Sequence, residues 1–410
     1  MGARQSLGRG FAWLWAAYGV SVFGTWLAFD AFPLVAILVL HAGPTEVAIL
    51  AASGAAVGAA VAVPLGPWVE FRRKRPVMVA MDLIRCAALL SVPAAYAPGW
   101  LSFGQLLVVS VVVAAADITF NAASGAYLKG LVPSEGLIVA NGRFESTMWT
   151  ASVLGPPLGG AAIGLFGPVL TVVANAVSFL LSALGIRAIG GEESRPVRTG
   201  DPARLRAADL LDGWRYILAD PTLRPLFFHT ILANGLIMAT APPLAVLMLG
   251  DLGYSPLEYT LAFALPCIGG LIGARLARPL VARFGQHTVL LTAGTLRACW
   301  LLGLPFVRPG PVGLAVIMVV EFGLIFCSGV FSPVLATVRL TRTATDRVTR
   351  TLSAWSVTTK LSIAAMTALW GLLAGLTSPR TALATAGVLI LATPLLLPFR
   401  RRPSDVGATS

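Results

Sequence analysis

Long apolar stretches alternate with short polar ones along almost the whole chain. Cutting the sequence at its charges, prolines and glycines leaves twelve apolar segments, most of them about 20 residues or longer. A helix of that length crosses the hydrocarbon layer of a bilayer, which is about 30 Å thick. The pattern predicts an all-α membrane protein with transmembrane spans at 11–39, 46–68, 76–96, 103–128, 139–165, 168–188, 225–249, 256–278, 287–306, 312–336, 350–374 and 380–399.

The composition supports membrane insertion and disfavours several classes of function. Of the 410 residues 57% are hydrophobic and 12% charged, and the mean hydropathy of +0.82 lies far from the usual soluble balance. The cysteines and histidines are scattered singly, so we predict no metal centre, no cofactor and no enzyme. The G-x-x-x-x-G-K-[ST] phosphate loop is missing from the sequence, which argues against ATP as the energy source.

Basic residues gather in alternate loops. If the N-terminus lies inside, the inner loops hold the "RRKR" run at 72–75, the arginines of 195–215, Arg278 and Arg283, those of 339–350 and the tail at 400–402, whereas only Arg308 and Arg380 lie outside. An excess of Lys and Arg in cytoplasmic loops is the usual orientation signal of membrane proteins. We therefore predict a multi-pass protein of the cell (inner) membrane with both termini in the cytoplasm. The net charge of +12 indicates topology and not nucleic-acid binding.

The two halves of the sequence resemble each other. Segment 31–46 aligns with 241–258, placing Glu46 opposite Glu258, and segment 72–87 aligns with 284–299, placing Arg85 opposite Arg297. Ser255, Pro256 and Glu258 fit the capping positions of a helix start, so we predict that the two glutamates are structural caps. The duplication predicts a six-helix half at 1–189 and another at 225–410, an arrangement that transporters use.

A polar, proline-containing segment separates the halves. We predict that 190–224 is a cytoplasmic linker. Its Leu210, Leu211, Trp214, Ile217 and Leu218 share one face at helical spacing, which predicts an amphipathic helix along the inner membrane surface.

Two short motifs carry a family resemblance. The segment "GPWVEFRRKR" is similar to G-x-x-x-D-x-x-G-R-K/R between spans two and three, with Glu70 for the aspartate and Arg73 for the second glycine. The segment "ASVLGPPLGG" in span five is similar to G-x-x-x-G-P-x-x-G-G, with Ala151 for the first glycine. With twelve spans in two halves, the chain resembles the major facilitator superfamily, and within it the bacterial drug and natural-product exporters, including the macrolide-efflux and siderophore-exporter-like group.

The resemblance implies a cytoplasmic gate and a flexible span five. A carboxylate at Glu70 can pair with Arg85 of the next helix or lie on the N-terminus of a helix from the other half. The alternative is that these charges only anchor a solvated turn. Replacing the second glycine by Arg73 puts the family's tight turn in doubt. The gate candidates are Gly66, Glu70, Arg73, Lys74, Arg75, Asp82 and Arg85, and the span-five hinge candidates are Gly155, Pro156, Gly159 and Gly160.

Four ionisable residues fall near the middle of predicted spans: Asp30, Asp117, Glu321 and Lys360. Charges in a membrane are costly and by default mark function. A carboxylate in a poorly hydrated cavity resists ionisation, so it can take a proton from outside and release it inside. We rank Asp30 and Asp117 ahead of Glu321 as proton carriers because Lys360 is available as a fixed partner of Glu321. The alternative is permanent pairing with Lys360 or hydrogen bonding to Asn121, Asn175 or Asn234.

The resemblance places spans one, four, seven and ten around a central cavity. The cavity candidates are Trp26, Phe29, Phe120, Asn121 and Asn234, with further aromatic residues at Trp149, Phe263, Phe322, Phe326 and Trp355. A wide apolar lining suits a bulky amphiphilic cargo better than a sugar. We therefore predict a monomeric, proton-coupled antiporter that exports a hydrophobic or amphiphilic small molecule, such as an antibiotic. An importer or facilitator of a nutrient, or a membrane sensor without transport, are the alternatives.

Overall fold

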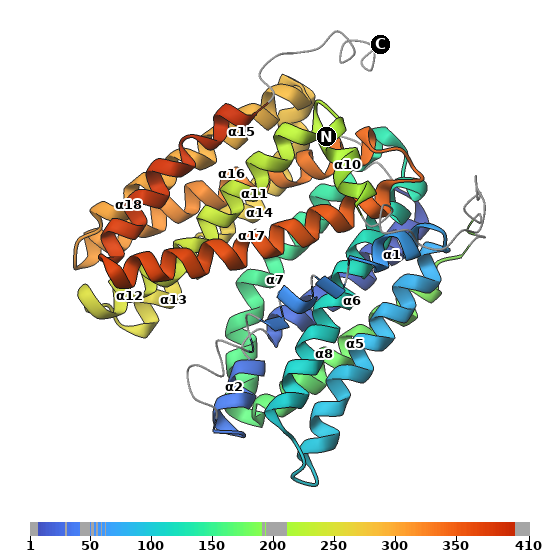
Figure 1. The fold of residues 1–410 in the computed structure, drawn as a ribbon, viewed down its shortest axis with the longest axis horizontal. Coiled ribbons are helices and arrows are strands. Elements are labelled where there is room, and N and C mark those ends of the chain that lie inside the picture. The colour runs from blue at the N-terminus through green and yellow to red at the C-terminus, as the bar shows by residue number, and fades with distance from the viewer. Residues whose placement is uncertain are drawn as a thin grey trace. The chain divides into compact units, whose positions relative to one another are not determined.

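The computed structural model describes residues 7–28, 31–41, 50, 53–54, 56–58, 60–61, 63–190, 193 and 211–397. Within these ranges every regular element is a helix. The sequence-predicted Phe29, Asp30, Glu46, most of span two, most of the linker and the basic tail lie outside them. The first part of the chain forms α1 (Gly8–Leu27), α2 (Ala31–Leu38), α4 (Leu65–Glu70), α5 (Lys74–Tyr96), α6 (Phe103–Leu131), η1 (Ser134–Gly136), α7 (Leu137–Phe166) and α8 (Pro168–Arg187) (Figure 1).

The second part of the chain repeats this helical pattern. A short helix, α10, comes first and is followed by the helices of the predicted spans seven to twelve. The elements are α10 (Asp212–Ala219), α11 (Leu223–Ala239), α12 (Ala241–Val246), the π-helical turn η2 (Leu247–Asp251), α13 (Pro256–Ala264), α14 (Cys267–Phe284), α15 (Gln286–Cys299), η3 (Trp300–Phe306), α16 (Pro311–Arg342), α17 (Val348–Leu376), α18 (Pro379–Ile390) and η4 (Thr393–Leu396).

Nine helices of the described ranges are long and apolar enough to cross a membrane, by length and composition. They cover the predicted spans three, four, six and seven to twelve. The helix of predicted span five, α7, has 30 residues, but its glycines and prolines make it less apolar. Predicted span one appears as α1 and α2 on either side of Phe29 and Asp30.

Proline and small polar residues mark the starts of several helices. Pro168 and Pro379 occupy the first turn, where a missing N–H costs no hydrogen bond. At α13 the predicted capping box is present: Ser255 Oγ accepts from the Glu258 N–H at 3.3 Å, and Glu258 Oε2 accepts from the Ser255 N–H at 2.8 Å. The prediction that Glu258 is a structural cap is confirmed.

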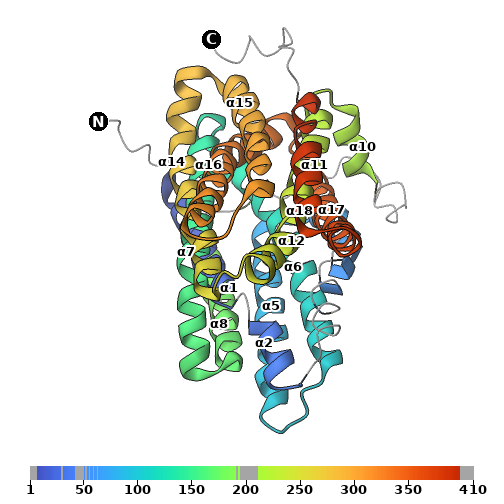
Figure 2. The same ribbon diagram turned by 90° about the vertical axis from the view of Figure 1, so that its left-hand side faces the viewer.

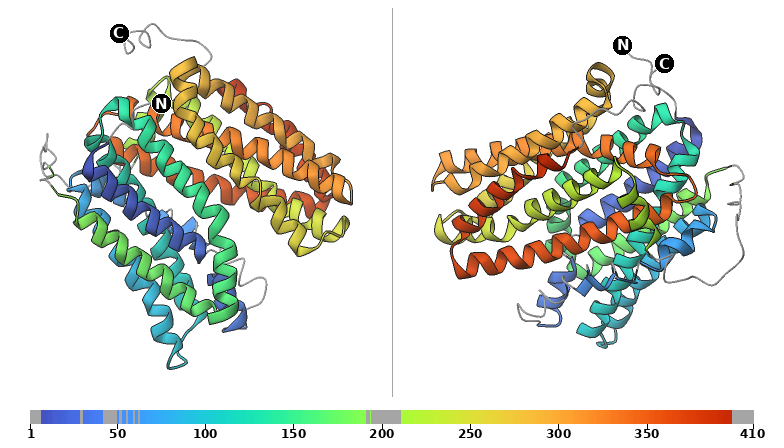
Figure 3. Two further views of the ribbon diagram at one scale, coloured as in Figure 1. Left: turned by 180° about the vertical axis from the view of Figure 1, so that it is seen from behind. Right: turned by 45° about the horizontal axis from the view of Figure 1, so that its top comes forward.

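The chain folds into two compact units. Unit 1 comprises Met1–Tyr216 and Leu340–Leu361, and unit 2 comprises Ile217–Arg339 and Ser362–Ser410. In unit 1, α5 packs against α6 and α8, and α1 packs against α7 and α8 (Figure 3). In unit 2, α11 packs against α18, and α15 packs against α14 and η3 (Figure 2). Segment 340–361, which the duplication assigns to the second half of the sequence, thus packs within unit 1; the division at 189 and 225 stays a prediction.

Each unit has its own tightly packed interior. Phe11, Leu14 and Met78 in unit 1 are at most 1% exposed, and Leu301 and Ile317 in unit 2 are fully buried. Since lipid tails are as apolar as these side chains, close van der Waals packing is what holds such helices together in a membrane. This packing fixes the positions of the polar groups described next.

Candidate functional site

The charged loop after α4 turns without a left-handed residue. Arg73, the cap residue of α5, has φ −60° and ψ 130°, an extended conformation open to any side chain. Gly285, which the duplication aligns with Arg73, has φ +80° and requires glycine. The doubt raised by Arg73 is therefore resolved, because unit 1 makes its turn by a different backbone path.

The basic run holds this turn together. The Lys74 ammonium donates to the carbonyl oxygens of Val69, Glu70 and Arg72, at 2.9, 2.6 and 2.9 Å, which ties off the end of α4. The Glu193 carboxylate accepts the backbone N–H groups of Lys74 and Arg75 at the positive N-terminus of α5.

Arg75 and Arg73 also belong to the basic run at 72–75. Arg75 donates to the carbonyl oxygen of Ile189, and Arg73 is exposed. Gly66 lies within α4. Lys74 and Arg75 therefore anchor the turn.

The acid of the loop pairs with the start of α17. Glu70 forms an ion pair with Nε of Arg350, and both side chains are only 11% exposed. Burial raises the pKa of Glu70 to about 7, while the charge and hydrogen bond of Arg350 oppose the rise. The predicted pairing of Glu70 with Arg85 is wrong, because Arg85 lies eleven residues into α5, about 16 Å along its axis from Lys74. The alternative prediction places Glu70 at the N-terminus of a helix from the second half of the sequence. Arg350 is the third residue of α17, so the ion pair does bring Glu70 to the start of such a helix.

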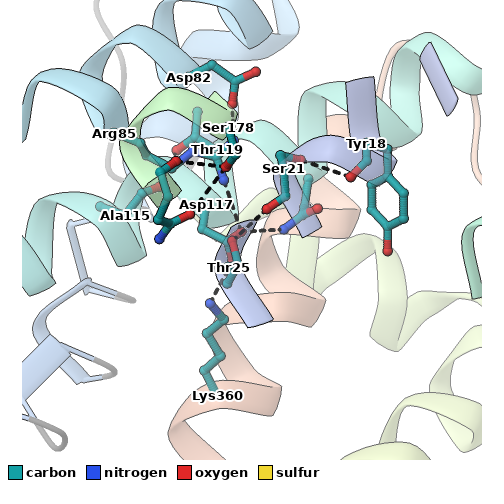
Figure 4. A network of polar contacts seen from close by, with 12 residues as sticks. Tyr18, Ser21, Thr25, Asp82, Arg85, Ala115, Asp117, Thr119, Ser178 and Lys360 are labelled. Atoms are coloured by element: carbon teal, nitrogen blue, oxygen red, sulfur yellow. Dashed lines mark hydrogen bonds and ion pairs between the residues drawn. The ribbon is translucent and has the colours of Figure 1, made fainter. Parts of the chain in front are cut away.

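Arg85 belongs instead to a chain of alternating charges in the interior of unit 1 (Figure 4). It pairs with Asp82, which is fully buried, and its Nη1 lies 3.4 Å from Oδ1 of Asp117. The Lys360 ammonium donates to Oδ2 of Asp117 at 3.0 Å, and Asn121 donates to Oδ1 at 3.1 Å. Two carboxylates and two cations make the chain electrically neutral. Asp82 and Arg85 are therefore interior charges and not part of the Glu70 turn.

One end of this series of charged side chains is exposed and the other is buried. Arg85 is 4% exposed, whereas Asp117 and Lys360 are 37% and 35% exposed. The cavity candidate Phe120 is buried and carries the Arg85 guanidinium on its face at 4.6 Å, with Phe179 at 4.1 Å. Phe120 thus supports the charged residues of this network, and its role as a cavity residue stays a prediction. The basis for ranking Glu321 last is removed, since Lys360 pairs with Asp117.

The glycines of α7 let α1 approach closely. A Cβ atom at Gly155 would overlap Trp26, and one at Gly159 would overlap the carbonyl group of Leu27. A Cβ at Gly160 would meet nothing within 4 Å. The helix continues through Pro156. The predicted close packing is confirmed for Gly155 and Gly159, and the predicted hinge motion stays a prediction.

Unit 2 holds a buried acid of a different kind. Glu321 of α16 is 7% exposed and, among the described residues, makes no hydrogen bond and no ion pair. A hollow of about 370 Å³ lies near the same level of α16. It is lined by Leu265, Pro266, Trp300, Met318, Val319, Phe322, Gly323 and Phe326, so the aromatic candidates Phe322 and Phe326 line a cavity.

Unit 2 also buries an arginine, which the duplication aligns with Arg85. Arg297 is 2% exposed and donates to Nε2 of His229 at 3.2 Å and to Asn234 at 3.4 Å. Because His229 Nδ1 lies 2.9 Å from the carbonyl oxygen of Thr393, Nδ1 carries the proton and Nε2 accepts. Asn234, a cavity candidate, thus serves Arg297.

Three residues of these networks have no role of their own among the sequence-based predictions: Arg350, Glu193 and His229. Arg350 counts there only as a basic loop residue, Glu193 lies in the predicted linker, and His229 is one of the singly scattered histidines. Their signal was weak because each partner is distant in sequence: Glu70 is 280 positions from Arg350. The Arg85–Arg297 alignment pointed to the buried polar position beside His229.

Comparison with known proteins agrees with this architecture. The family model of the Major Facilitator Superfamily matches residues 14–338 and 231–410. A relative named multidrug efflux pump Tap, from Mycolicibacterium fortuitum, is 25% identical over 313 residues, 73% of this chain and 74% of the relative. An uncharacterized MFS-type transporter, YvqJ of Bacillus subtilis, is 26% identical over 295 residues, 70% and 68% of the two chains.

The solved structures agree on the fold. A bacterial homologue of the iron transporter ferroportin, in an outward-facing state, superposes with a TM-score of 0.79 at 17% identity, covering 95% of this chain and 98% of that one. Fold, buried charges and family match define a multi-pass membrane transport protein. The chain belongs to the Major Facilitator Superfamily.

Proposed function

We propose that this chain is a proton-coupled antiporter that exports a hydrophobic or amphiphilic small molecule by alternating access. Its place is the inner membrane of a bacterium, with both termini in the cytoplasm. Within the superfamily we assign it to the drug and natural-product exporters, the macrolide-efflux and siderophore-exporter-like group. The name of the Tap relatives and the Gly-Pro segment of α7 support export.

The observation that carries the proposal is the contrast between two acids inside spans. Asp117 is compensated by Lys360 and Arg85, so its charge is stabilised where it lies. Glu321 is buried with no hydrogen-bond or ion-pair partner among the described residues. An uncompensated carboxylate in such a place favours its neutral, protonated form. We therefore assign the transported proton to Glu321, and to Asp117 the exchange of Lys360 for a cationic or polar group of the cargo.

The hollow beside α16 supports an apolar cargo. Its walls are aliphatic and aromatic side chains, and pockets of this kind bind ligands mainly by apolar surface with a few polar groups fixing orientation. The stacked rings of Phe322 and Phe326, 6.3 Å apart, offer a flat surface for an aromatic ring of the cargo.

The test uses an efflux-deficient bacterial strain producing the full chain. Accumulation of a panel of hydrophobic antibiotics and dyes is measured with and without a proton uncoupler. The chain should lower accumulation, and the uncoupler should abolish the difference. Glu321→Gln should raise accumulation to the level of cells without the protein. Glu258→Gln is the matched control, since Glu258 is a cap in the first turn of α13.

Two outcomes contradict the proposal. Producing the chain could raise uncoupler-sensitive accumulation of the panel, which would make it an importer. Alternatively, Glu321→Gln at normal membrane abundance could export as well as the unmodified chain, which would remove Glu321 from proton coupling.

A further inference from the structure

Helix α10, in the linker between the sequence halves, forms hydrogen bonds with the segment 340–361. The indole N–H of Trp214 donates to Oγ1 of Thr358 at 2.8 Å. The Tyr216 hydroxyl donates to the carbonyl oxygen of Arg342 at 3.0 Å and accepts from the N–H of Ala344 at 3.1 Å. These contacts lie within unit 1. The predicted amphipathic face of this helix is therefore not uniform. Trp214 makes a hydrogen bond inside the protein, whereas Leu211 and Leu218 are exposed.

A shared guanidinium adds an ion pair to the hydrogen bonds between α10 and this segment. Arg350 pairs with Glu70 through Nε and donates from Nη1 to Oδ2 of Asp212 at 3.1 Å. Arg347 lies 3.9 Å from the same Asp212 oxygen. Arg350 is 11% exposed and Asp212 28%, so water screens the pair only in part. Arg350 thus forms ion pairs with two carboxylates, Glu70 and Asp212, that come from different segments of the chain.

We propose that Asp212 is a gate-positioning residue: it holds Arg350 where Glu70 can pair with it, so that α10 and the turn after α4 together fasten segment 340–361 to unit 1. The linker helix is then part of the gate and not a passive tether. The gate's place in a transport cycle rests on the proposed function, but the fastening itself does not.

The pH dependence of the fastening distinguishes this role from a purely structural one. The charged groups that face Glu70 are Arg350, Lys74 and Asp346, and Asp212 and Arg347 share the surroundings of Arg350. Burial raises the pKa of Glu70 to about 7, so a proton favours the fastened state. Without Asp212, Arg350 is no longer held where its charge and hydrogen bond oppose the effect of burial on Glu70. The pH dependence should then move to higher pH.

A buried position on the segment reports release. Thr349 is 1% exposed, so a cysteine there reacts with a maleimide only when segment 340–361 separates from the rest of unit 1. The experiment uses purified full-length protein with Cys86, Cys267, Cys299 and Cys327 replaced by alanine. Labelling of Thr349→Cys is followed from pH 5 to 8.5. Rates are divided by those of Thr345→Cys, an exposed position on the same segment.

Asp212→Asn should raise the normalised labelling rate about fivefold to tenfold, the effect of losing roughly 1 to 1.4 kcal/mol of a partly buried ion pair. It should also shift the midpoint of the pH dependence upward. Asp212→Glu keeps the charge and should stay within about twofold of the background rate. Glu135→Gln, an exposed acid away from Arg350, is the matched control and should change neither rate nor midpoint.

Combining Asp212→Asn with Glu70→Gln should give less than the product of the single effects, because both act through Arg350. A background rate and unchanged midpoint for Asp212→Asn would overturn the proposal, as would a double variant equal to the product. The labelling requires no cargo and no proton gradient. A failure of the export assay therefore leaves this test intact, and the reverse also holds.

Discussion

Replacing Gly159 by alanine tests whether α1 and α7 touch as closely as the structure shows. The added Cβ would overlap the backbone carbonyl of Leu27, which cannot rotate away as a side chain can. Overpacking a closely fitted interface costs about 1 to 3 kcal/mol. Gly160 is one position further along the same helix and has nothing within 4 Å of its would-be Cβ. There alanine should stabilise the helix by about 0.5 to 1 kcal/mol.

The two variants should therefore differ by roughly 2 to 4 kcal/mol in opposite directions from the parent protein. Thermal unfolding of the purified protein, followed by tryptophan fluorescence, measures the difference as a lowered Tm for Gly159→Ala and an equal or raised Tm for Gly160→Ala. Equal melting temperatures for both variants would refute the argument, since they share chemistry and helix and differ only in the neighbour. Membrane abundance of both variants is measured alongside to show that each reaches the bilayer.

Three further predictions concern the charged interior and the turn after α4. Arg85→Met leaves fully buried Asp82 without its cation and should destabilise the protein by about 3 to 5 kcal/mol, read as a lowered Tm, with Asp82→Asn in the same chain restoring part of it. His229→Phe removes the acceptor of Arg297 and should cost about 1 to 3 kcal/mol, whereas His229→Gln keeps an acceptor and should cost less; equal losses would remove this hydrogen bond from the account. Because the folded pKa of Glu70 is raised from 4.5 to about 7, its contribution to stability is present below pH 4.5 and is lost as pH rises through 7. Between pH 5.5 and 8 the Tm of the parent should therefore fall more than that of Glu70→Gln, which corresponds to a loss of up to roughly 2 kcal/mol in stability.

The helical class and most span positions could be predicted because hydropathy leaves few alternatives. A run of about 20 apolar residues has to satisfy its backbone hydrogen bonds internally, which in a bilayer means a helix. The capping box at Ser255 and Glu258 could be predicted for a similar reason, since both partners lie within one helical turn. The packing role of Gly155 and Gly159 followed from their spacing of four, which places them on one face.

Partner choice in the charge networks could not be predicted in the same way. Asp117 is singled out by its depth, but the sequence-based ranking takes Lys360 as an available partner of Glu321, whereas the structure pairs Lys360 with Asp117. Geometry decides between them, because only packing within unit 1 brings α17 to α6. The sequence likewise leaves Glu70 between Arg85 and the N-terminus of a helix from the other half, and the structure joins it to Arg350. Contacts across hundreds of positions depend on the folded arrangement of helices, which no local pattern encodes.

Helix α17 belongs to both units, since its residues up to Leu361 pack in unit 1 and those from Ser362 in unit 2. It contains no proline, and its first glycine is Gly371, so it lacks the usual sites at which a helix kinks. Lys360 and Arg350 lie ten positions apart on this helix, about 15 Å along its axis. A displacement of α17 at Lys360 would therefore also displace Arg350, so that the ion pairs with Asp117 and Glu70 would break and form together.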